Sequence, residues 1–160
     1  GNLRAAYAIV FVVGILLWSI FFPNIKKTTV MLIGTGGLFL TCAFLFFLNH
    51  HPSLDAPLVM PLALLIVVSV IIQSGFTPAA LSYLADVTEE HTADRGAIMG
   101  MYSVFLGIGQ FLGSTIGGPF VDWKGADGIV IVTALLGVIS LVTLLRLFAN
   151  EKQILAPPTA

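Results

Sequence analysis

Polar side chains interrupt one long apolar stretch of the sequence near its middle. The stretch covers residues 58–85, and Gln73, Ser74, Thr77 and Pro78 lie close together within it. Pro78 has no N–H to donate to the carbonyl of Ser74, so we expect a kink or a local unwinding of a helix there. An amide, two hydroxyls and a free carbonyl would then gather where a polar solute could bind.

Two interpretations of this polar segment stay open. It either lines a pathway for a solute or forms a structural kink whose polar groups bond to neighbouring helices. Under the first interpretation the pathway residues are Gln73, Ser74, Thr77 and Pro78. Gln110 on the following apolar stretch could add a second amide.

The densest charge cluster follows this stretch and contains Asp86, Asp94 and Arg95. Asp86 near a helix C-terminus is unfavourably placed against the helix dipole, whereas Asp94 can cap the N-terminus of the next helix. Arg95 is therefore the expected partner of Asp86. The two residues form either an ion-pair latch at one mouth of the pathway or part of a solvated loop.

Patterns typical of catalysis or metal binding do not occur in the sequence. It contains no H-E-x-x-H or G-x-S-x-G motif and no pair of Asp residues inside an apolar stretch. His50 and His51 are consecutive, so they do not share one helix face, and Cys42 is the only cysteine. We therefore expect no enzymatic activity, no cofactor, no metal site and no nucleic-acid partner.

Five apolar stretches must position these residues, and each is about long enough to cross a bilayer as a helix, which takes about 20 residues. Hydrophobic residues make up 58% of the sequence and charged residues 9%, whereas soluble proteins carry about 25% charged residues. The stretches do not alternate in polarity, so they predict helices rather than membrane strands. They cover residues 5–22, 28–48, 58–85, 96–121 and 128–148.

The expected fold is therefore an all-α, polytopic bundle of five transmembrane helices in contact with the lipid bilayer. The bundle would occupy residues 1–148. Residues 149–160 form a short segment that ends in Pro157-Pro158-Thr159-Ala160, so we expect a disordered cytoplasmic tail there.

Small residues repeat along the fourth stretch at helical spacing. Such faces let helices pack closely in lipid, where no hydrophobic force pairs them. We expect a helix-packing surface here, either fixed or sliding, and lipid contact for the bulkier second and fifth stretches. The glycines of this surface are Gly96, Gly100 and Gly107 on one face and Gly109, Gly113 and Gly117 on the neighbouring face.

The placement of basic residues predicts the orientation of the helices. Connections alternate between the two sides of the membrane, and cytoplasmic connections carry an excess of Lys and Arg. The C-terminus is therefore expected in the cytoplasm of a cell-membrane protein, and the N-terminus outside. One side receives Lys26, Lys27, Arg95, Arg146 and Lys152, and the other receives Arg4 and Lys124.

The chain begins at Gly1, without an initiator Met, and enters an apolar stretch almost at once. No small-residue cleavage site follows that stretch, so it does not resemble a signal peptide. We expect a trimmed or truncated part of a longer protein. A naturally complete protein of five spans is the alternative.

Three short segments carry a pattern of Gly, Pro and an Asp-Arg-Gly sequence. They are Gly75-Phe76-Thr77-Pro78-Ala79-Ala80, Asp94-Arg95-Gly96-Ala97-Ile98-Met99-Gly100, and Gly109-Gln110-Phe111-Leu112-Gly113 with Gly117-Gly118-Pro119. Together with the five stretches they resemble the C-terminal half of a major facilitator superfamily transporter, helices eight to twelve of twelve. The sequence departs from the family between the first two stretches, where residues 23–27 keep only a basic pair of the family's Gly, Asp and Arg pattern.

The resemblance implies transport of a small organic solute by alternating access, with the N-terminal half of the same transporter as the partner. The third stretch would line the cavity, the first and fourth would rock against the other half, and the second and fifth would be outer supports. No ionisable residue lies deep inside a stretch, so a group that couples transport to protons would have to lie in the other half.

The resemblance leaves efflux and uptake open, as it does secondary active and facilitative transport. A non-transporting membrane scaffold is the alternative function, because small-residue helices also serve assembly alone. A membrane-embedded enzyme is a weaker alternative, for want of the motifs above.

Overall fold

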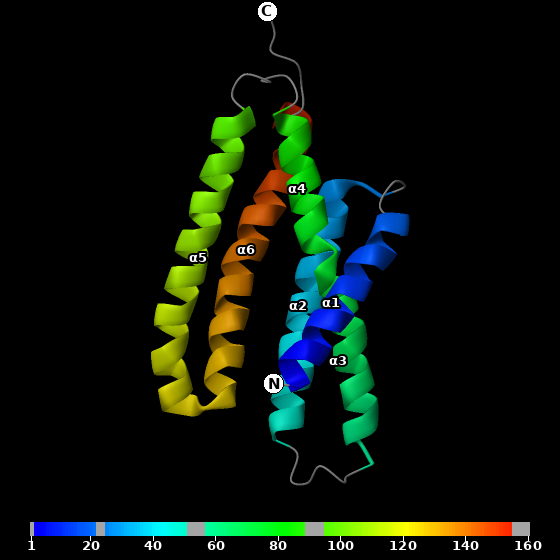
Figure 1. The fold of residues 1–160 in the computed structure, drawn as a ribbon, viewed down its shortest axis with the longest axis vertical. Helices are drawn as coiled ribbons and strands as arrows, with labels where there is room; N and C mark the ends of the chain where they lie inside the picture. Colours follow the sequence, from blue (N-terminus) through cyan, green and yellow to red (C-terminus); the bar gives the residue numbers. More distant parts are fainter. Residues whose placement is uncertain (1, 22–24, 51–56, 89–94, 155–160) are drawn as a thin grey trace, which may run out of the picture.

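The chain folds into a bundle of helices in which successive spans run in opposite directions, and α3 and α4 follow each other in the same direction as one interrupted span (Figure 1). The computed structural model describes residues 2–21, 25–50, 57–88 and 95–154, and no strand occurs in these segments. The predicted all-α fold is confirmed. The helices are α1 (Asn2–Phe21), α2 (Lys27–Asn49), α3 (Val59–Ser74), α4 (Phe76–Val87), α5 (Arg95–Lys124) and α6 (Ala126–Ile154).

Four helical segments are long and apolar enough to cross a membrane, namely α2, α3 together with α4, α5 and α6. α1 contains a shorter apolar run, Ala5–Ile20. A helix satisfies its backbone N–H and C=O groups internally, which is what a hydrocarbon solvent requires. The bundle is therefore that of a multi-pass membrane protein.

α2 lies at the centre of the described bundle and packs against α3, α4 and α6. Its apolar window is 39% buried, the largest share among the four spans. Gly37 allows the close approach of α3, because a Cβ there would lie 2.6 Å from the backbone nitrogen of Gln73. Phe46 and Phe47 remain exposed. Only part of this span is therefore exposed, and the lipid contact expected for it stays a prediction.

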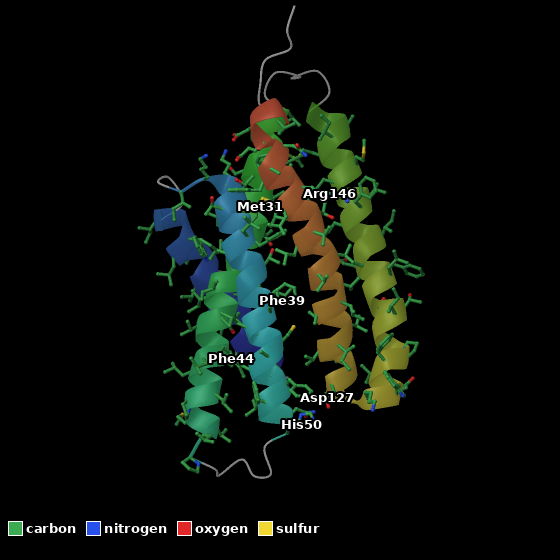
Figure 2. All side chains as sticks on the ribbon, turned by 180° about the vertical axis from the view of Figure 1, so that it is seen from behind. Met31, Phe39, Phe44, His50, Asp127 and Arg146 are labelled. Atoms are coloured by element: carbon green, nitrogen blue, oxygen red, sulfur yellow. The ribbon has the colours of Figure 1, made fainter. Side chains whose placement is uncertain are left out.

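A buried cluster joins α2, α4 and α6 in one half of the bundle. Its members are Val30, Met31, Ala79, Tyr83 and Leu144. Figure 2 shows Met31 on α2 in the same half as Arg146 on α6. In lipid, apolar burial gives no hydrophobic drive between helices, so van der Waals packing of such side chains stabilises the contact.

α5 stands at one edge of the bundle and packs along α6 (Figure 1). The connection between them is shorter than the sequence predicts. Gly125 has φ 58° and ends α5, with its N–H donating to the Val121 carbonyl oxygen at 2.7 Å. This left-handed conformation suits glycine at a helix C-terminus. Gly128 then passes so close to the Phe120 carbonyl that a Cβ would overlap it.

α6 is longer than the fifth apolar stretch and continues to Ile154. Residues 149–154 are therefore helical, contrary to the disorder expected after Ala149. Asn150 donates a hydrogen bond to the Arg146 carbonyl at 3.0 Å, and the following Glu, Lys and Gln residues favour helix. Residues 155–160 lie outside the described part of the chain.

The glycine-rich face of α5 has no neighbour among the described residues. A Cβ added to any of its six predicted packing glycines would meet no atom within 4 Å. None of the apolar window of α5 is buried. The expected helix-packing surface of Gly96, Gly100, Gly107, Gly109, Gly113 and Gly117 thus stays a prediction.

Candidate functional site

The predicted interruption of the third span is present, and it lies at Gly75, between α3 and α4. The Gly75 N–H donates to the Ile72 carbonyl at 3.4 Å, one residue nearer than a regular α-helix requires. The Ile71 carbonyl instead accepts two side-chain hydrogen bonds. These come from Trp18 Nε1 at 2.9 Å and from Ser74 Oγ at 2.7 Å.

Pro78 lies in the first turn of α4, which begins at Phe76. The first N–H groups of a helix have no intrahelical partner, so a proline there removes no backbone hydrogen bond. The Ser74 carbonyl receives no hydrogen bond from residue 78, as expected, because Pro78 has no N–H. The break itself, however, is centred on Gly75 and on the carbonyl of Ile71.

α1 crosses the junction of α3 and α4 at this break, because two glycines leave room for the close contact. A Cβ on Gly75 would lie 2.6 Å from Cε2 of the Trp18 ring. A Cβ on Gly14 of α1 would overlap the Ser74 hydroxyl. Ser74 is fully buried under this crossing and bonds to its own helix, so it does not face open space.

A cavity of about 160 Å³ lies beside the break, between α1, α2, α3, α4 and α6. Gln73 and Thr77 line it, as the sequence predicts for a solute pathway. Ser74 and Pro78 are not among its lining residues, and Gln110 is exposed on α5. The lining residues are Phe11, Gly34, Thr35, Leu38, Gln73, Phe76, Thr77 and Ser140.

Sequence reasoning missed Thr35 and Ser140, which bring two further hydroxyls to this cavity. Thr35 is 3% exposed and donates to the Met31 carbonyl at 2.9 Å. Its position among Gly34, Gly36 and Gly37 was a signal, since that run lets another helix approach α2. Ser140 stands alone in an apolar run, and nothing in its sequence surroundings marks it.

The carboxamide of Gln73 lies beside a hydroxyl network between α2 and α3. Thr41 Oγ1 lies 2.8 Å from Ser69 Oγ and 3.5 Å from Gln73 Oε1. Thr41 and Ser69 are buried, and Thr41 also bonds to the Gly37 carbonyl at 2.9 Å. The Thr41 hydroxyl has one hydrogen, and the Gly37 carbonyl is the closer acceptor, so the 3.5 Å contact with Gln73 Oε1 is the weaker of the two.

Charged and polar residues gather at the end of the bundle where α2 begins and α4 and α6 end. Lys27 forms an ion pair with Asp86 and donates to the Ser82 carbonyl at 3.3 Å. Thr28 is fully buried and lies 3.1 Å, Oγ1 to Oε1, from Glu151.

Asp86 thus has Lys27 as its observed partner, whereas its expected partner was Arg95. The side chain of Arg95 lies outside the described residues, so the predicted pair of Asp86 with Arg95 stays a prediction. Lys27 belongs to the basic pair before the second span. Because it is far from Asp86 in the sequence, no local pattern predicts their contact.

The opposite end of α2 meets the start of α6 through Asp127 (Figure 2). Asn49 Nδ2 donates to Asp127 Oδ1 at 2.8 Å, and His50 Nε2 lies 3.4 Å from Asp127 Oδ2. Within the described segments no group of three or more His, Cys, Asp or Glu side chains could hold a metal ion. His51 lies outside them.

Comparison with protein-family models matches residues 1–159 to the Major Facilitator Superfamily. The chain belongs to the major facilitator superfamily. No curated protein and no solved structure matches it.

Membership in the major facilitator superfamily agrees with the observed helices, four of which are long and apolar enough to span a membrane. It identifies the chain as a membrane transport protein of the major facilitator kind. The cavity beside the α3–α4 break is then the candidate place for a solute.

Proposed function

We propose that these helices are the C-terminal half of a twelve-helix transporter, helices eight to twelve, which moves a small organic solute by alternating access. The main support for this proposal is the cavity beside the break. It lies near the middle of α1, α2 and α6 and beside the break in the third span. Broken helices and neutral polar groups at this depth are typical of a transporter's binding site.

The exposed glycine face of α5 supports the proposal that a further helix packs against it in the complete transporter. A face of small side chains is poorly suited to fill space against lipid, and it suits the close approach of another helix. We assign the N-terminal half of the same transporter to this face, so that α5 and α1 would move against it during the cycle.

The proposed membrane is the cell membrane, with the C-terminus in the cytoplasm. The placement of Lys26, Lys27 and Arg146 supports this orientation, because these residues lie toward the end of the bundle where α6 ends, whereas Lys124 lies at the opposite end. An excess of Lys and Arg is typical of cytoplasmic ends.

The test of alternating access is chemical labelling of Thr77→Cys in the full-length protein. Thr77 lines the cavity and is exposed in this structure. A membrane-impermeant thiol reagent should label it in right-side-out vesicles and, in separate samples, in inside-out vesicles. Native Cys42 is buried and should give little background.

Ile139→Cys is the matched control, because Ile139 is 64% exposed on an apolar face of α6. A lipid-facing thiol should resist a water-soluble reagent from both sides. Labelling of Thr77→Cys from one side only would contradict alternating access through this cavity.

A further inference from the structure

The cavity beside the α3–α4 break holds no ionisable side chain among its eight lining residues. The nearest charged residues along the lining helices lie outside the cavity. Arg146 on α6 is six residues from Ser140 and Lys27 on α2 is seven from Gly34, about 9 and 10.5 Å at the helical rise, and Lys27 is already paired with Asp86. A charged solute in the cavity would lose hydration without gaining a counter-ion, which is costly.

Two aromatic rings form part of the wall and are held in place by their neighbours. The Phe11 ring stacks on Tyr7 with centroids 5.9 Å apart. Phe76 is pressed against α2, because a Cβ on Gly34 would lie 2.9 Å from the Phe76 Cβ. Aromatic side chains fixed in this way can pack against an aromatic ring of a solute, and such pairs prefer offset-stacked or edge-to-face contacts.

Neutral hydrogen-bonding groups complete the wall. Gln73 Oε1 faces Thr41, and among the described residues no acceptor binds the Gln73 Nε2 hydrogens. Thr35 uses its hydroxyl hydrogen on the Met31 carbonyl, which leaves its oxygen able to accept. Thr77 and Ser140 add hydroxyls on two other helices. The wall can therefore donate to and accept from a neutral amide or hydroxyl.

The volume limits the size of the solute. An engineered protein cavity of about 150 Å³ binds benzene, and this cavity measures about 160 Å³. One six-membered ring with a small substituent fills that space, whereas a second fused ring would extend beyond it through the open side.

From these features we propose that the cavity binds uncharged solutes with a single ring and one amide or hydroxyl group, and excludes ions of the same shape. The ring lies against Phe11 and Phe76, and the polar group bonds with Gln73, Thr77 and Ser140. This selectivity rests on the proposed transport function, because it describes the solute of the same pathway.

The test uses three probes of nearly equal shape, measured by equilibrium dialysis against the full-length protein in lipid nanodiscs. Nicotinamide is neutral, nicotinate is an anion, and 3-(aminomethyl)pyridine is a cation at pH 7. Nicotinamide should bind at least tenfold more tightly than either ion. Quinoline-3-carboxamide, a neutral probe with two fused rings, should also bind at least tenfold more weakly than nicotinamide.

Variants on α6 locate the binding. Ser140→Leu fills the cavity and should weaken nicotinamide binding at least tenfold, and Ser140→Ala should weaken it severalfold without adding bulk. Thr143→Leu is the control, because Thr143 is exposed and bonds only to its own helix at the Ile139 carbonyl. It should bind as the unmodified protein does.

Three outcomes would overturn the selectivity: tighter or equal binding of an ion, equal binding of the two-ring probe, or no binding of nicotinamide. Undiminished binding in Ser140→Leu would also overturn it, because the ligand would then lie elsewhere. The Thr77→Cys labelling is independent of these probes. Labelling from both sides together with any of these outcomes leaves alternating access standing and removes the selectivity, whereas one-sided labelling removes alternating access through this cavity.

Discussion

Trp18 Nε1 donates a hydrogen bond to the carbonyl oxygen of Ile71 at 2.9 Å and so joins α1 to α3 at the break in the third span. This carbonyl lacks its regular helical donor, because the Gly75 N–H is turned to Ile72. An unpaired carbonyl at membrane depth is costly, and the indole removes that cost. The position of α1 and the break in the third span are therefore coupled.

Trp18→Phe keeps the aromatic packing and removes this donor. We expect a loss of about 0.5–1.5 kcal/mol in stability, the usual range for one hydrogen bond, partly offset because Ser74 still bonds to the carbonyl. Thermal unfolding of the purified full-length protein measures it. Trp123→Phe on α5 is the control, since Trp123 is 67% exposed and should change little. Equal effects of the two changes would contradict the role of the indole N–H.

Gly75→Ala and Pro78→Ala distinguish the two residues that could cause the break. The added methyl of Gly75→Ala would collide with the Trp18 ring, and overpacking costs about 1–3 kcal/mol. Pro78→Ala should change stability by less than about 0.5 kcal/mol, because residue 78 is in the first turn of α4. Thermal stability of both variants measures the difference. The reverse order would show that proline, rather than the glycine contact, sets the break.

Gly113→Leu tests the face of α5 that no described residue covers. If the N-terminal half packs there, a leucine should reduce the folded yield, with a cost of about 1–3 kcal/mol. Gly37→Leu is the positive control, because any side chain at Gly37 meets the α3 backbone. Yield of monodisperse full-length protein by size-exclusion chromatography is the measurement. An unaltered yield for Gly113→Leu would place this face against lipid and would remove the assigned partner.

Asp86 has an observed partner, Lys27, and a predicted one, Arg95. Double-mutant cycles with alanine at each pair should separate them. The Lys27–Asp86 side chains are 26% and 43% exposed, so we expect their coupling to stay below about 1 kcal/mol. A latch formed with Arg95 should also shift the balance of inward-open and outward-open states when either residue is neutralised, and the charge swap should partly restore it. Zero coupling between Asp86 and Arg95 in both stability and state balance would remove that latch.

The sequence by itself determined the solvent of this protein and the number of its helical stretches. Apolar runs of about 20 residues leave the backbone no partner in lipid except its own helix, so helices follow directly from composition. The interruption near Gly75 and the polar character of its surroundings, with Gln73 and Thr77, were also readable, because glycine, proline and polar side chains stand out in such a run. That a solute passes there stays a prediction.

The tertiary structure decided which helices meet. Another helix packs closely against Gly14, Gly34 and Gly37, whereas no described residue packs against the glycines of α5. Their spacing in the sequence does not distinguish the two sets. Thr35 and Ser140 join the cavity, and Lys27 meets Asp86, through contacts between distant parts of the chain. Helical periodicity fixes which face a residue occupies, but the neighbour of that face depends on the packing of whole helices, which no local pattern encodes.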